Sequence, residues 1–184
     1  MKVGNKQDNG GIIQSESTLE MINSLTIVRL PKSASSQLPS RGIVMVRGVI
    51  NEIPFKKVLE PDGKGGHWFA IDDKLLEKIG NVAGETLSLS VIPSKEWIEP
   101  EIPTDIQNAR ESSPKAYAVW NDTTPMARWD WLRWIRFTEN LETRAHRIDV
   151  TISKLSAGKK RPCCFNRNMC TVQNVCYKGL LSNS

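Results

Sequence analysis

The sequence predicts an α+β protein in which a small closed antiparallel β-barrel of about six strands precedes a C-terminal helical module. Short segments rich in β-branched residues, separated by turn residues, occupy the first half of the chain, as is typical of all-β domains. Helical periodicity replaces this pattern in the second half. We expect the strands to close into a barrel, because closure removes exposed strand edges.

The first hairpin is predicted around Asn51 and Glu52. A β-branched run over 42–50 leads into this turn, and residues 53–56 return from it. A two-residue type I′ turn favours Asn-Gly, because its second position needs a positive φ. Glu52 therefore either tolerates that conformation or belongs to a turn of another type.

A second hairpin is predicted where the glycine-rich segment 61–66 joins two short strands. Residues 72–79 are then expected to form a short helix, which Asp72 caps and Gly80 ends.

The last strand of the barrel is predicted over 86–92, where strict alternation places Leu87, Leu89 and Val91 on one face. The polar stretch 31–41 is expected to be an irregular connection between strands.

Helix starts in the second half are marked by residues whose side chains can accept free backbone amides. The expected caps are Thr104 (with Gln107 completing a capping box), Ser113, Thr124 and Asn140. The last helix is expected to bury a stripe of residues at helical spacing and to end at Gly158. The stripe comprises Leu141, Ala145, Ile148, Ile152 and Leu155.

Changes in composition divide the chain into five parts, with the acidic, proline-bearing stretch 96–103 as the main boundary. The expected parts are a disordered leader (1–17), a barrel domain (18–98), a linker with short helices (99–125), a helical module (126–171) and a tail (172–184). The leader has no secretory pattern, and no apolar run is long enough to span a bilayer. We therefore expect a cytoplasmic protein with reduced thiols.

Positive charge is concentrated in the C-terminal third. The chain carries a formal net charge of +5, whereas residues 126–168 hold ten lysines and arginines against four acidic residues, a net +6. This asymmetry favours an anionic partner, such as nucleic acid or another polyanion.

Four of the six tryptophans lie between Trp120 and Trp134, interleaved with arginines. Trp129, Arg133 and Phe137 follow one another at i,i+4 spacing, opposite the face expected in the core. They either pack against the barrel, with guanidinium groups stacked on rings, or form an exposed surface that grips a polyanion. The core face comprises Ala127, Trp131, Trp134 and Ile135.

The candidate site for an anionic ligand combines these aromatic residues with the basic residues around them. Its members are Trp129, Arg133, Arg136, Phe137, Arg144, Arg147, Lys159, Lys160, Arg161 and Arg167. The sequence identifies no catalytic residues, no metal ligands and no cofactor site.

An alternative site is predicted at the mouth of the barrel, where Lys64, His67 and Trp68 could hold a small molecule or support an enzyme. The loop 62–66 lacks the strand–loop–helix setting and the hydroxyl residue of a phosphate-binding loop. We therefore interpret it as an ordinary hairpin loop.

The four cysteines do not have the paired spacing that tetrahedral zinc sites require. We expect them to be buried, inert thiols. The alternative is a redox site at Cys163, Cys164 and Cys170, because neighbouring cations could lower a thiol pKa.

Four stretches carry a resemblance to a known family: residues 38–48, 59–69, 124–135 and 158–170, the last including Arg161-Pro-Cys-Cys-Phe-Asn-Arg-Asn-Met-Cys170. Over residues 18–171 the chain resembles bacterial proteins that join a small β-barrel domain of unknown function to a helical module named bacteriocin-protection, YdeI or OmpD-associated. The resemblance implies a compact barrel of about six strands followed by helices, and it supplies no catalytic residues. The turn at Asn51-Glu52 departs from the Asn-Gly usual in these proteins.

These observations favour a non-enzymatic binding module whose basic helical arm engages an anionic partner, within a stress or peptide-resistance response. The alternatives are the small-molecule or enzyme site at the barrel mouth and a thiol redox sensor.

Overall fold

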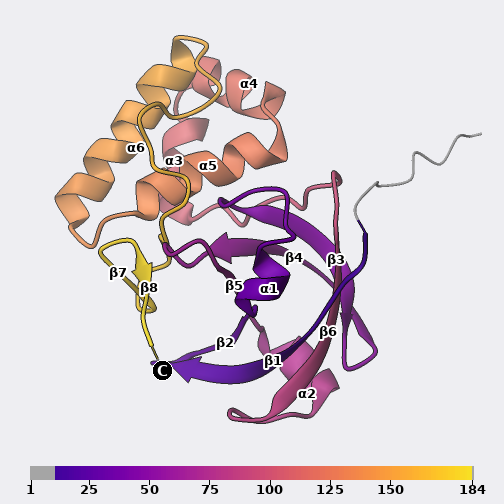
Figure 1. Ribbon diagram of the computed structural model, residues 1–184. Helices are drawn as coiled ribbons and strands as arrows, with labels where there is room; N and C mark the ends of the chain where they lie inside the picture. Colours follow the sequence, from indigo (N-terminus) through magenta and orange to yellow (C-terminus); the bar gives the residue numbers. More distant parts are fainter. Residues whose placement is uncertain (1–10, 184) are drawn as a thin grey trace, which may run out of the picture.

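A computed structural model describes residues 11–183 and contains a closed six-stranded β-barrel, as predicted. The strands follow the order β1-β2-β5-β4-β3-β6 around the barrel, and every neighbouring pair is antiparallel (Figure 1). The strands are β1 (Ile13–Ile22), β2 (Leu25–Arg29), β3 (Val44–Ile50), β4 (Ile53–Pro61), β5 (His67–Ala70) and β6 (Thr86–Pro93).

The first strand begins inside the segment expected to be a leader. β1 pairs with β6 from Ile13 opposite Val91 to Thr18 opposite Thr86, and this pairing closes the barrel. Residues 11–17 therefore belong to the barrel domain, and the remainder of the expected leader, residues 1–10, lies outside the described residues. The polar composition of β1 concealed it, because its outward positions carry Gln14, Glu16 and Thr18 and one of its buried residues is Ser17.

The two predicted hairpins are confirmed. Ile50 pairs with Ile53 across the first turn, where Asn51 and Glu52 have φ angles of 43° and 70°. Both central residues thus have the positive φ of a type I′ turn. Glu52 tolerates this conformation without being glycine.

The barrel interior is a packed core. Leu87, Leu89 and Val91 are buried on one face of β6, as predicted, and the rings of Phe55 and Phe69 stack with centroids 5.3 Å apart. Two short helices, α1 (Lys32–Ser35) and α2 (Asp73–Ile79), add residues to this core. Asp72 caps α2 and Gly80 ends it, whereas α1 lies within the stretch expected to be irregular.

Four helices form the second domain and share a core of their own. They are α3 (Thr104–Glu111), α4 (Pro114–Asp122), α5 (Pro125–Arg136) and α6 (Leu141–Ser156). Ile106 and Trp120 are buried in that core, so α3 and α4 belong to the helical domain rather than to a linker. Ser113, Thr124 and Asn140 cap their helices as predicted. Thr104, by contrast, is the first residue of α3 and makes no capping bond, because Pro103 precedes the helix.

The buried stripe of α6 is shorter than predicted. Ile148 and Leu155 are buried and Ile152 packs beside them, but Leu141 is 81% exposed and Ala145 is also exposed. The first turn of α6 thus extends beyond the helical core.

The chain returns to the barrel after α6. Its tail forms a small hairpin of β7 (Cys176–Tyr177) and β8 (Leu180–Leu181), which lies beside the barrel (Figure 1). Val175 and Leu181 pack with Trp68 of β5 in a cluster on the outside of the barrel. A disulfide joins Cys170 to Cys176, which corrects the expectation that all thiols are reduced. Among residues 11–183, no helix combines the length and apolar character that crossing a membrane requires.

Candidate functional site

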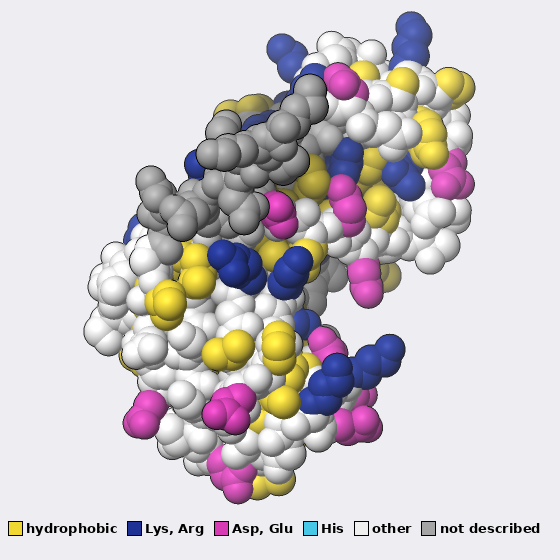
Figure 2. All heavy atoms as spheres, turned by 90° about the vertical axis from the view of Figure 1, so that its right-hand side faces the viewer, with side chains coloured by type: hydrophobic (Ala, Val, Ile, Leu, Met, Phe, Trp, Pro, Cys, Tyr) yellow, Lys and Arg dark blue, Asp and Glu magenta, His cyan; other side chains and the backbone are white. Residues whose placement is uncertain are grey.

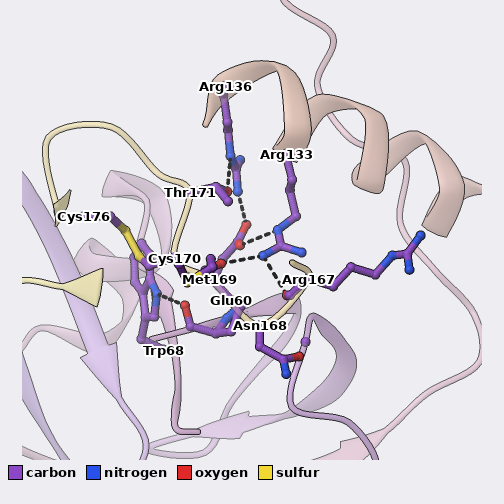
Figure 3. Close-up of polar contacts among 12 residues, drawn as sticks. Glu60, Trp68, Arg133, Arg136, Arg167, Asn168, Met169, Cys170, Thr171 and Cys176 are labelled. Atoms are coloured by element: carbon purple, nitrogen blue, oxygen red, sulfur yellow. Dashed lines mark hydrogen bonds and ion pairs between the residues drawn. A yellow bond between two sulfur atoms is a disulfide. The ribbon is translucent and has the colours of Figure 1, made fainter. Parts of the chain in front are cut away.

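A buried charge cluster joins the two domains. Arg133 and Arg136 are three residues apart on α5, so both side chains leave the same side of that helix. Both reach Glu60 near the end of β4 (Figure 3). Nε of Arg133 lies 3.3 Å from Oε2 of Glu60, and Nη2 of Arg136 donates to Oε1 at 2.6 Å. We call Glu60, Arg133 and Arg136 the interdomain cluster.

Arg133 is enclosed by protein. Its side chain is 0% exposed, and Nη2 donates to the backbone carbonyls of Arg167 and Met169 at 3.1 and 2.8 Å. Its guanidinium lies 5.4 Å from the centroid of the Phe165 ring. Arg133 therefore fixes the segment that follows α6 against α5 and the barrel.

Opposing effects act on the pKa of Glu60. Burial alone would raise this pKa, but the positive charges of Arg136 and Arg133 and the hydrogen bond from Arg136 hold it below its ordinary value. Glu60 is therefore an ionised carboxylate at neutral pH, and the interdomain cluster carries two positive charges against one negative charge.

A groove of about 660 Å³ runs between the barrel and the helical domain beside this cluster. In the space-filling view, a notch separates the helical lobe from the barrel lobe, with basic and acidic side chains near it (Figure 2). The apolar part of the groove lining includes Val58 and Phe69 from the barrel, Trp129 and Leu132 from α5, and Ile98 and Ile102 from the connecting segment. Trp129 is held there by the hydrogen bond from its Nε1 to the Ile98 carbonyl, at 2.9 Å.

Arg136 lies in this groove with part of its guanidinium free. Its Nε donates to Thr171 and its Nη2 to Glu60, but Nη1 has no hydrogen-bond partner among residues 11–183. The Arg136 side chain is 25% exposed. An anion entering the groove would therefore meet available N–H donors.

Charges of both signs surround this arginine. Arg144 and Lys57 also line the groove, although each is already paired, Arg144 with Asp105 and Lys57 with Asp72. The lining also includes two exposed carboxylates, Glu99 and Glu101, which bring negative charge to the groove. The groove thus offers one open cationic donor in mixed, mostly apolar surroundings.

The residues predicted to form one anionic-ligand surface do not lie together. Trp129 packs against the barrel, Arg133 is buried in the interdomain cluster, and Arg136 faces the groove. Phe137 is half-buried against Phe165, and Arg147 stacks over Trp134 while donating to the carbonyls of Trp134 and Phe137 at the C-terminal end of α5. This is the packed arrangement, rather than the exposed one, of the two that the sequence left open.

The remaining members of the predicted set lie in the segment after α6. Lys159, Lys160 and Arg161 are exposed, and Lys160 pairs with Asp122 of α4. Arg167 is exposed but pairs with the buried Asp130 of α5. This basic segment is therefore separate from the groove lining.

The predicted barrel-mouth site does not present its histidine to solvent. His67 is 0% exposed, and its Nε2 lies 2.9 Å from the Gly42 carbonyl oxygen. Burial lowers the pKa of His67, so its imidazole is neutral. Trp68 is also buried, contributes to the groove lining and donates to the Pro61 carbonyl, while Lys64 lies in the exposed hairpin loop.

The cysteines differ from the expectation of buried thiols. Cys163 and Cys164 are exposed free thiols, whereas Cys170 is buried in the disulfide. Among the described residues, no group of three or more His, Cys, Asp or Glu side chains is placed to hold a metal ion.

Glu60 was missed by reasoning from the sequence. The available signal was the position of Glu60. It is the one carboxylate of β4, and its neighbours Leu59 and Pro61 are buried. A charged residue buried in such a strand needs an opposite charge nearby, but the sequence does not reveal which arginine supplies it.

The fold and the groove define a two-domain protein, a barrel joined to a four-helix unit with the candidate site between them. Comparison with known families agrees with this division. Residues 11–91 match a domain of unknown function (DUF1905), and residues 99–158 match the family described as Bacteriocin-protection, YdeI or OmpD-Associated. The two matches fall on the barrel and on the helical domain, in the order that the resemblance in the sequence predicted. No curated protein matches it.

Proposed function

We propose that the protein is a non-enzymatic binding module whose interdomain groove takes a ligand with one anionic group and an apolar body. The observation that carries this proposal is the open Nη1 of Arg136 in a groove lined by Trp129, Ile98 and Ile102. The guanidinium would hold the anion through charge-assisted hydrogen bonds, and the rings and aliphatic side chains would cover the rest of the ligand.

The charges around the groove favour a single anionic group over a polyanion. The acidic residues of its lining (Glu60, Glu99 and Glu101) balance the basic ones (Lys57, Arg136 and Arg144), so the groove presents no continuous run of positive charge to a polyanion. The name of the family that the helical domain matches supports a setting in resistance to bacteriocins, which are peptides. A peptide carboxylate is one group that Arg136 could hold.

The first test compares two dyes that differ by one anionic group, anilinonaphthalene sulfonate and the neutral N-phenylnaphthylamine. Both report binding by their fluorescence. We expect the protein to bind the sulfonate more tightly than the neutral dye. The Arg136→Gln variant should weaken sulfonate binding about tenfold, because a hydrogen bond to a charged group contributes about 1.5–3 kcal/mol, while leaving the neutral dye unaffected.

Arg161→Gln is the matched control, because it removes the same charge from an exposed position outside the groove lining. It should leave both affinities unchanged. Equal affinity for the two dyes, or a preference lost in Arg161→Gln and kept in Arg136→Gln, would reject the groove as the site. Unfolding curves for each variant exclude loss of the fold as the cause.

A polyanion partner is tested on the same proteins with DNA, RNA and heparin at low and at physiological salt. The groove proposal expects little binding at physiological salt. Tight binding that weakens steeply with salt, and is lost when Lys159, Lys160 and Arg161 are changed to Gln together, would instead assign function to the basic segment after α6.

A further inference from the structure

The two free thiols of the described chain lie side by side in the segment after α6. Both Cys163 and Cys164 are exposed, and Nζ of Lys154 lies 3.3 Å from Sγ of Cys163. Adjacent side chains ordinarily point in different directions. Here Cys164 has a φ of 59°, in the left-handed region.

The environment makes the two sulfur atoms unequal. Interaction with the adjacent Cys164 thiol and with the ammonium of Lys154 lowers the pKa of Cys163, and interaction with Cys163 raises the pKa of Cys164. Cys163 is therefore the sulfur more readily present as a thiolate, which is the reactive nucleophile. Cys164 remains a thiol until its neighbour has reacted.

Basic residues just before this pair in the chain favour a negatively charged reactant. Lys159, Lys160 and Arg161 are exposed just before it, and of these Lys160 has an ion-pair partner, Asp122. A reactant that carries carboxylates is attracted to such a surface, and a cationic one is repelled.

We propose that Cys163 and Cys164 form a thiol–disulfide exchange site for anionic low-molecular-weight disulfides, with Cys163 as the nucleophile and Cys164 as the resolving thiol. The Cys163 thiolate attacks one sulfur of the disulfide, whose S–S bond breaks as the mixed disulfide on Cys163 forms. One thiolate leaves and takes a proton from water. Cys164 then loses its proton and attacks Sγ of Cys163, which releases the second thiolate. The two cysteines are oxidised to a vicinal disulfide, and the small disulfide is reduced to two thiols.

The test uses oxidised glutathione as the anionic probe and mass spectrometry with peptide mapping as the readout. We expect the wild-type protein to lose two hydrogen atoms at the 163–164 pair without keeping an adduct. The Cys164→Ser variant should accumulate a glutathione adduct on Cys163. The Cys163→Ser variant should react about tenfold more slowly, because its remaining thiol lacks the stabilised thiolate.

Two comparisons separate this chemistry from the general reactivity of exposed thiols. Lys154→Gln should slow adduct formation in the Cys164→Ser background, whereas Lys56→Gln, which removes an exposed lysine from the barrel, should not. Cystamine, a cationic disulfide, should react more slowly than oxidised glutathione with the same variant. Equal rates for the two single-serine variants, or no effect of Lys154→Gln, would refute the assignment of Cys163 as the nucleophile. A stable glutathione adduct on the wild-type protein would refute the resolving role of Cys164.

Discussion

Arg133 of α5 and Glu60 of β4 form an ion pair across the boundary between the two domains, with the arginine side chain 0% and the glutamate side chain 9% exposed. Two such buried charges stabilise the protein only while both are present, because each leaves the other uncompensated when it is removed. The pair therefore couples the orientation of α5 to that of the barrel.

Replacing Glu60 with glutamine should lower the free energy of unfolding by about 3 kcal/mol, because it leaves two arginines without their carboxylate. Urea unfolding followed by tryptophan fluorescence measures the difference. Glu20→Gln is the matched control, since Glu20 pairs with Arg29 in a more exposed position and should cost less than about 1 kcal/mol. Equal costs for the two substitutions would show that the interdomain cluster contributes no more than a surface pair.

The contribution of Glu60 to the free energy of unfolding should decrease as the pH falls. Its pKa in the folded protein lies below its ordinary value of 4.5, so the unfolded chain takes up the proton first as the pH falls. The stability difference between wild type and Glu60→Gln should be full above pH 4.5, shrink below it, and vanish below the folded-state pKa. A difference that grows on acidification would contradict this assignment.

Glu52→Gly should raise the free energy of unfolding by about 0.5–1 kcal/mol. Glu52 occupies the left-handed region with φ of 70°, where a side chain is strained and glycine is not, although glycine recovers less than the full strain because it gains entropy when unfolded. Thermal or urea unfolding provides the measurement. As a control, the same substitution at the exposed helical residue Glu77 should instead lower the free energy of unfolding by about 1 kcal/mol.

His67 should titrate below its ordinary pKa of 6.5, because burial disfavours the charged imidazole. The chain has two histidines, so His146→Gln leaves a single imidazole whose NMR signals follow His67 alone. Since the unfolded chain is protonated first, stability should begin to fall as the pH drops below 6.5. A midpoint at or above 6.5 would mean that the imidazole is accessible in the folded protein.

Local features of the fold could be predicted from the sequence, whereas the site could not. Caps such as Ser113 and Asn140 act on amides three residues away, so short-range patterns suffice to find them. The bond between Glu60 and Arg136 joins residues 76 positions apart. Helical spacing grouped Arg133 with Arg136 correctly, but it could not tell that the surface they face is the barrel rather than solvent.

Strand β1 illustrates the opposite difficulty. Most of its outward residues are polar and the buried Ser17 interrupts its apolar face, so composition alone resembles an unstructured segment. Its partner β6 is far along the chain, and only the requirement that the barrel close explains why these residues are ordered.

The return of the chain to the barrel after α6 gives the helical domain a second attachment. This domain follows the barrel through the segment before α3, and the tail binds the barrel again where the Leu181 amide donates to the Asp62 carbonyl. The interdomain cluster adds a third tie, through the pairs that Arg133 and Arg136 form with Glu60. Removing the tail would therefore leave the segment before α3 and the interdomain cluster to hold the two domains together.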